Sequence, residues 1–168
     1  MLKFLNKKKN DNKGFSLVEL IIVVAILAIL VGLLAPQYIK YVEKSRKSAD
    51  ASNLSEMVNA VQIYAADAES SLPAGTYTIT ISETGTAITG GAGNGLTEVQ
   101  KAVAETAPDY TNTKLKSSKW EDGKENEPIV ANIVVDDNGG TKVTYSPKKL
   151  RDLINNKATT AAASSKNN

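Results

Sequence analysis

Residues 13–36 read KGFSLVELIIVVAILAILVGLLAP, and this stretch determines the structure of the N-terminal part of the chain. A lysine and a glycine lead into an apolar run. From Leu20 to Ala35 this run carries no charge and no strongly hydrogen-bonding side chain. One carboxylate, Glu19, lies near the start of the run. An acid is costly in lipid, and ionisable groups inside apolar segments tend to be functional, so Glu19 is a candidate functional residue.

The apolar segment from Phe15 to Ala35 is long enough to cross a membrane. It has 21 residues, which span about 31 Å as an α-helix, close to the roughly 30 Å of a bilayer core. The apolar segment has three possible interpretations. It is a signal peptide, an ordinary membrane anchor, or an anchor that remains on the mature protein after cleavage between Gly14 and Phe15. The first fits poorly, because the run is long and no Ala-x-Ala-like site follows it. The second leaves Glu19 unexplained.

The motif KGFSLVEL, followed by this apolar run, resembles the N-termini of type IV prepilins and the related pseudopilins. An aromatic residue follows Gly14, a glutamate stands five places after it, and Pro36 stands at the twenty-second place. The resemblance covers about residues 1–65. It implies that a prepilin peptidase, which is also a methyltransferase, cuts after Gly14 and N-methylates Phe15. It further implies a homo-oligomeric helical filament, built by inner-membrane pilus assembly machinery.

The resemblance also implies a role for Glu19 in assembly. After cleavage the nearest candidate cation is the α-amine of Phe15, and in the family's fibre it is thought to come from a neighbouring subunit. Opposite charges attract strongly at low dielectric, and each is costly when unpaired. We therefore predict that Glu19 sets the register of assembly. The alternative is an interfacial glutamate that reaches out to water.

Gly32 and Pro36 predict a soft point in the helix. Proline lacks an N–H and leaves the carbonyl of Gly32 without its helical partner, and glycine is itself a weak helix former. A kink at the membrane exit is the simpler expectation. The resemblance adds that this segment unwinds or extends inside a fibre.

The rest of the chain predicts an α+β pilin fold, in which a long kinked N-terminal helix packs on a small antiparallel sheet. Apolar residues recur at helical spacing from Leu54 to Ala68, and residues 76–81 alternate as a strand does. We expect a loop at 82–95, a helix at 96–106, Trp120 as the anchor of a polar loop at 109–127, strands at 129–135 and 141–145, and a short helix at 147–155. The predicted regions are a cleaved basic leader (1–14), a membrane and filament-core half-helix (15–36), an amphipathic half-helix (37–75), a β-rich head (76–156) and a disordered tail (157–168).

Composition disfavours several other functions. The chain has no histidine and no cysteine, so a membrane-anchored enzyme would lack the commonest bases and ligands, and we expect no enzyme activity, no cofactor and no metal site. Residues 15–168 carry a net charge of −2, which does not suggest nucleic-acid binding. The glycine-rich run at 90–95 lacks a phosphate-loop spacing. The turn at 136–140 could ligate calcium, but an ordinary turn is favoured.

The expected function is therefore a structural subunit of a type IV pilus, involved in adhesion, motility or biofilm formation. Before assembly it would be a single-pass membrane protein in contact with lipid, and afterwards part of a cell-surface pilus. The alternative is a pseudopilin of a type II secretion or DNA-uptake system. The absence of cysteine departs from the disulfide-closed loop frequent in the family. In this the chain resembles pilins of Gram-positive anaerobes, where it would be a major pilin, or disulfide-free pseudopilins.

Overall fold

The computed structural model describes residues 16–67, 72–121 and 123–165. It divides into two units, one ending at Lys40 and the other beginning at Tyr41. The long helix α1, Leu17–Ala66, contributes to both units.

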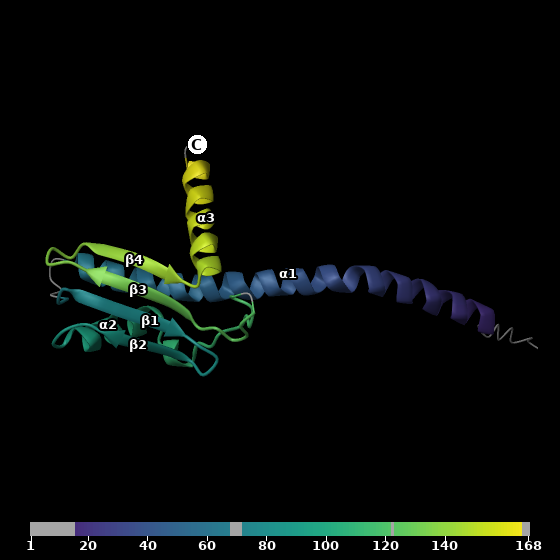
Figure 1. The fold of residues 1–168 in the computed structure, drawn as a ribbon, viewed down its shortest axis with the longest axis horizontal. Coiled ribbons are helices and arrows are strands. Elements are labelled where there is room, and N and C mark those ends of the chain that lie inside the picture. The colour runs from purple at the N-terminus through teal and green to yellow at the C-terminus, as the bar shows by residue number, and fades with distance from the viewer. Residues whose placement is uncertain (1–15, 68–71, 122, 166–168) are drawn as a thin grey trace, which may run out of the picture. The chain divides into compact units, whose positions relative to one another are not determined.

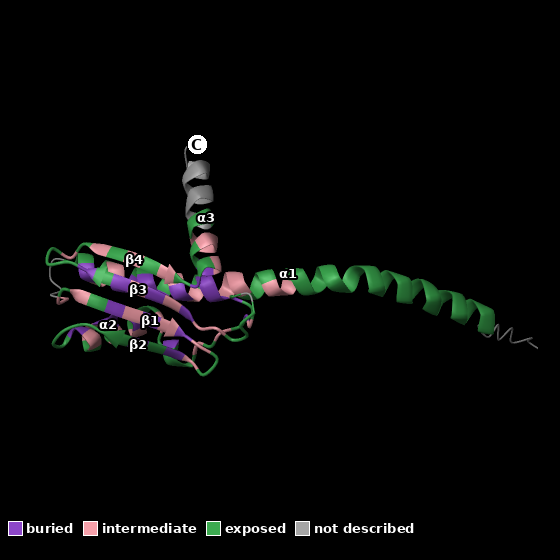
Figure 2. Cartoon of the chain, viewed as in Figure 1, coloured by how far each residue is buried: buried purple, intermediate pink, exposed green. Residues whose placement is uncertain are grey.

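The N-terminal part of α1 is exposed along its whole described length. Residues 16–40 include no buried side chain, and large apolar residues are as much as 72% exposed, the value for Leu17. Figure 2 shows this part of the helix in the colour of exposed residues. By length and composition it could cross a membrane, because its most apolar window has a mean hydropathy of 3.2 and is 0% buried. The predicted apolar half of the helix is confirmed.

The C-terminal part of α1 supplies one wall of the core of the second unit. Its buried apolar residues fall at helical spacing, so they form one stripe along the helix. They are Ala51, Leu54, Met57, Val58, Ala60, Val61 and Ala65. The amphipathic half of the predicted helix is therefore present, up to Ala66.

A four-stranded antiparallel sheet faces this stripe (Figure 1). The strands lie in the order β2-β1-β3-β4, and consecutive neighbours in this order are antiparallel. Residues alternate between the two faces of each strand, and Ile79 of β1 lies opposite Ile88 and Ala131 on the buried face. The strands are β1 Gly75–Ile81, β2 Thr86–Gly90, β3 Ile129–Val135 and β4 Thr141–Ser146. The predicted α+β class is confirmed.

Strand β2 corrects the sequence analysis, which placed residues 82–95 in a loop. Residues 86–90 instead pair with β1 through a short turn, in which the Ser82 N–H donates to the Gly85 carbonyl at 2.9 Å. The strand has a single large apolar residue, Ile88, and ends in glycine, so its own sequence carries almost no alternating pattern. Pairing with the strongly patterned β1 overrides that weak local preference.

The helix predicted at 96–106 and the buried tryptophan predicted in the loop after it are both present. Helix α2, Gly95–Thr106, buries Val99 and Val103 against the core. A 3-10 turn, Tyr110–Asn112, follows it. Trp120 is fully buried, which confirms its role as the anchor of the following loop.

Helix α3, Lys148–Ser165, follows β4 and is longer than predicted. Leu150 packs fully into the core. The sequence analysis assigned residues 157–168 to a disordered tail, which is wrong for 157–165, because these residues continue the helix. Alanine is the best helix former, so this alanine-rich stretch extends a helix that has already been nucleated. Residues 166–168 lie outside the described part.

Candidate functional site

The segment with the predicted processing and assembly residues lies at the start of α1. Gly14 and Phe15, the predicted cleavage and methylation positions, lie outside the described residues. The helix begins just after them, where the Leu20 N–H donates to the Ser16 carbonyl at 3.1 Å. Ser16 thus precedes the first helical residue, a position where serine is favoured.

Glu19 lies in the first turn of α1 and is exposed. A carboxylate there is favoured by the helix dipole, whose positive end is at the N-terminus. Among the described residues, no hydrogen bond or ion pair involves its side chain. In lipid such a group needs a partner from the undescribed N-terminus or from another molecule. The assembly role of Glu19 stays a prediction.

The predicted soft point at Gly32 and Pro36 lies within unbroken helix, since α1 is assigned as helical through both residues. A methyl group added at Gly32 would meet nothing within 4 Å. No packing within the described residues therefore requires a glycine here. Whether this segment unwinds stays a prediction.

A second group of polar side chains, which the sequence analysis missed, centres on Asp50 of α1. Its carboxylate is 1% exposed and accepts three hydrogen bonds. The backbone N–H groups of Lys116 and Ser117 each donate at 2.9 Å, and the indole N–H of Trp120 donates at 3.2 Å. A buried carboxylate is tolerated only when it is paired or fully hydrogen-bonded in this way. We call this arrangement the Asp50 clasp.

The clasp extends toward the N-terminus of α1, by about one helical turn to Lys47 and about two turns to Glu43. The Ser117 hydroxyl donates a short hydrogen bond to the Glu43 carboxylate. The ammonium of Lys47 lies 5.7 Å from the centre of the Trp120 ring, within the range of a cation–π interaction. These contacts fasten the loop between α2 and β3 to α1. The sequence analysis did not single out Asp50, because no local pattern reveals hydrogen-bond donors that lie 66, 67 and 70 residues further along the chain.

A further contact joins the other end of α1 to α2. The Tyr64 hydroxyl donates to the Glu98 carboxylate at 2.7 Å. This hydrogen bond holds the phenolic proton, and with partial burial it raises the pKa of Tyr64 above its usual value near 10. Burial also raises the pKa of Tyr77 and Tyr145.

The two loops that resembled ligand sites have structural roles. In the glycine-rich loop, side chains at Gly91 and Gly95 would run into the Tyr77 ring and hydroxyl, so these glycines make room for that tyrosine. In the predicted turn at 136–140, Asp136 accepts the N–H groups of Asn138 at 2.9 Å and Gly140 at 2.7 Å. Among the described residues, no cluster of three or more acidic, cysteine or histidine side chains is arranged to hold a metal ion.

Comparison with known proteins adds one finding. No curated protein and no solved structure matches the chain. Residues 9–35 match the family model of the prokaryotic N-terminal methylation motif. The match includes the predicted cleavage site, Glu19 and the apolar run, and it ends just before Pro36. The chain therefore carries a prepilin-type N-terminal methylation segment, joined to an α+β fold of the kind expected for a type IV pilin-like protein.

Proposed function

We propose that this chain is a structural subunit of a type IV pilus, anchored in the membrane before assembly and polymerised through its N-terminal helix. One observation carries the proposal. The methylation motif leads into a helix segment that is strongly apolar and exposed on all sides. Such a surface is stable only in lipid or against other apolar helices.

The processing steps proposed for the chain follow from the motif. A prepilin peptidase cuts after Gly14, and the new N-terminal Phe15 is methylated. The amine of Phe15 on a neighbouring subunit then pairs with Glu19, which sets the stagger between helices. The apolar segment thus serves twice, first as a lipid anchor and then as the core of the filament.

The partners proposed for the chain are the peptidase, the membrane-embedded assembly machinery and other copies of the chain. The subunit itself does no chemistry, and we propose adhesion, motility or biofilm formation as the role of the filament. A pseudopilin of a secretion or DNA-uptake system is the competing proposal, because the methylation motif supports both equally.

The deciding experiment is intact-mass and N-terminal analysis of filaments sheared from cells, together with electron microscopy of the cell surface. We expect abundant long filaments whose subunit begins with N-methyl-Phe15. A Gly14→Val variant should keep its leader and make no filaments, while Lys13→Gln is the matched control that should still be processed. Removal of the leader from Gly14→Val would contradict the proposed processing. Processed protein without surface filaments would favour the pseudopilin.

A further inference from the structure

The positive charge of the chain after the leader is concentrated in two short segments, 43–50 and 113–120. They contain six of the fifteen lysines and arginines that follow residue 14, and only two acids. The rest of residues 15–168 has nine such cations and fifteen acids. The six cations are Lys44, Arg46, Lys47, Lys114, Lys116 and Lys119. We call them the basic collar.

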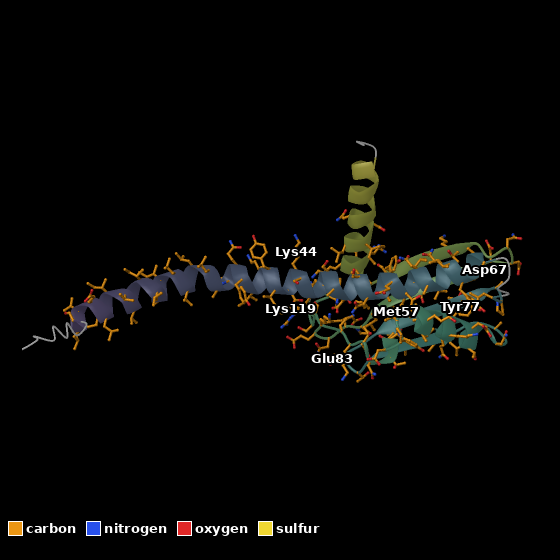
Figure 3. All side chains as sticks on the ribbon, turned by 180° about the vertical axis from the view of Figure 1, so that it is seen from behind. Lys44, Met57, Asp67, Tyr77, Glu83 and Lys119 are labelled. Carbon is orange, nitrogen blue, oxygen red and sulfur yellow. The ribbon has the colours of Figure 1, made fainter. Side chains whose placement is uncertain are left out.

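The Asp50 clasp brings the two segments of the collar together. Backbone N–H groups of the loop bond to Asp50, so the lysines on either side of them are held beside residues 43–50 of α1. Figure 3 shows Lys44 on the helix and Lys119 on the loop at the same level along α1. The side chains of Lys114, Lys116 and Lys119 are exposed, as are those of Lys44 and Arg46.

The two acids within the collar segments are both engaged by the loop. Asp50 is buried beneath the loop, and Glu43 accepts the hydroxyl of Ser117. Among the described residues, no ion pair involves the five exposed cations of the collar, which are Lys44, Arg46, Lys114, Lys116 and Lys119. The collar therefore presents a surplus of positive charge on an acidic body.

The collar follows the apolar segment closely along the chain. Lys44 comes nine residues after Ala35, a helical rise of about 14 Å, and the headgroup layer of a bilayer occupies roughly the first 5–7 Å of that. The rest of this distance, from the headgroup layer to Lys44, is about one Debye length at physiological salt. Lysines are attracted to anionic lipids over this range. Tyr41, which is 69% exposed, is of the type enriched at membrane interfaces.

We propose that the basic collar binds the anionic headgroups of the membrane that holds the apolar segment, and so docks the head on the membrane surface before assembly. The inference rests on the membrane anchoring in the proposed function. The partner is identified by its charge and its position. When the apolar segment is in a bilayer, the anionic headgroups lie next to the end of that segment.

The test uses the full chain reconstituted in vesicles of phosphatidylcholine, alone or mixed equally with phosphatidylglycerol. A membrane-impermeant lysine-acylating reagent is applied, and mass spectrometry follows each lysine. We expect Lys114, Lys116 and Lys119 to react at least about three-fold more slowly on anionic vesicles, and high salt to abolish the difference. Lys101 and Lys142, exposed elsewhere on the head, are the internal controls and should react equally in both.

A second readout uses the single tryptophan of the chain, Trp120. Energy transfer from Trp120 to a dansyl-labelled headgroup lipid should be greater in anionic vesicles. The triple variant Lys114→Gln, Lys116→Gln, Lys119→Gln should lose this gain, and Lys101→Gln, Lys142→Gln should keep it. The triple variant retains the clasp, which uses backbone N–H groups and the indole, and an unchanged Trp120 emission maximum checks this.

Equal acylation rates in a chain that floats with both kinds of vesicle would overturn the collar proposal. So would shielding of the lysines that appears only in assembled filaments, because it would assign the collar to acidic groups of a neighbouring subunit. A chain that floats with neither kind of vesicle would instead contradict membrane anchoring, so the two failures are distinguishable.

Discussion

Asp50 makes the strongest prediction at the scale of single residues. Replacing it with alanine leaves the N–H groups of Lys116, Ser117 and Trp120 without their acceptor. We expect Asp50→Ala to lower the free energy of unfolding by about 2–4 kcal/mol, because buried hydrogen bonds to charged groups are among the stronger ones. Urea unfolding in detergent, followed by Trp120 fluorescence, measures the change. Asp109→Asn, at an exposed position, is the control and should stay within about 0.5 kcal/mol.

Tyr64 predicts how the stability of the head falls in alkali. Folding raises the pKa of Tyr64, so its neutral hydroxyl stabilises the head. This contribution is complete at pH values below the pKa of the unfolded state, near 10, and is lost as the pH rises through the pKa of the folded state. Tyr64→Phe should lower the free energy of unfolding by about 1 kcal/mol at neutral pH. The variant should also lose less stability than the parent above about pH 10. Part of the loss of stability in alkali should remain, because burial also raises the pKa of Tyr77 and Tyr145. Thermal unfolding between pH 8 and 11 tests this, with the exposed Tyr41→Phe as control; a parallel loss in both variants would contradict it.

At the scale of elements, the glycine-rich loop between β2 and α2 allows a matched comparison. Gly91 and Gly93 both have positive φ, at 81° and 58°. A methyl group at Gly91 meets the Tyr77 ring, whereas one at Gly93 meets nothing within 4 Å. Gly93→Ala should cost the backbone strain alone, about 1–2 kcal/mol. Gly91→Ala should cost about 1–3 kcal/mol more because of the ring. Equal urea midpoints for the two variants would show that the ring moves aside freely.

The elements also show what the sequence could and could not predict. The C-terminal part of α1, β1, β3 and α2 follow from apolar periodicity, because each buries its own patterned face. The N-terminal part of α1 follows instead from its unbroken apolar run. Strand β2 has only one large apolar residue and depends on its neighbour, so it was missed. Glu19 and Pro36 could be found because their motif is local in the chain. The Asp50 clasp could not, because its donors are 66, 67 and 70 residues away.

At the scale of the whole molecule, we predict that substitution of Glu19 affects assembly and leaves membrane anchoring intact. We expect Glu19→Gln to insert in the membrane and to be processed between Gly14 and Phe15, but to form few or no filaments, because the variant cannot pair with the Phe15 amine of the next subunit. Immunoblots of membrane and sheared fractions measure both steps. Glu83→Gln, at an exposed position in the head, is the control. A normal yield of filaments from Glu19→Gln would contradict the prediction that Glu19 sets the register of assembly.

The Asp50 clasp has a consequence for the order in which the protein is made. During synthesis the apolar segment and Asp50 leave the ribosome long before Trp120, which follows Asp50 by 70 residues. Until then the carboxylate of Asp50 remains hydrated, and no sheet covers the apolar stripe on the C-terminal part of α1. Contacts between such distant residues form late and slowly. We therefore expect the head to fold after translocation, in one cooperative step, on a chain already tethered to the bilayer.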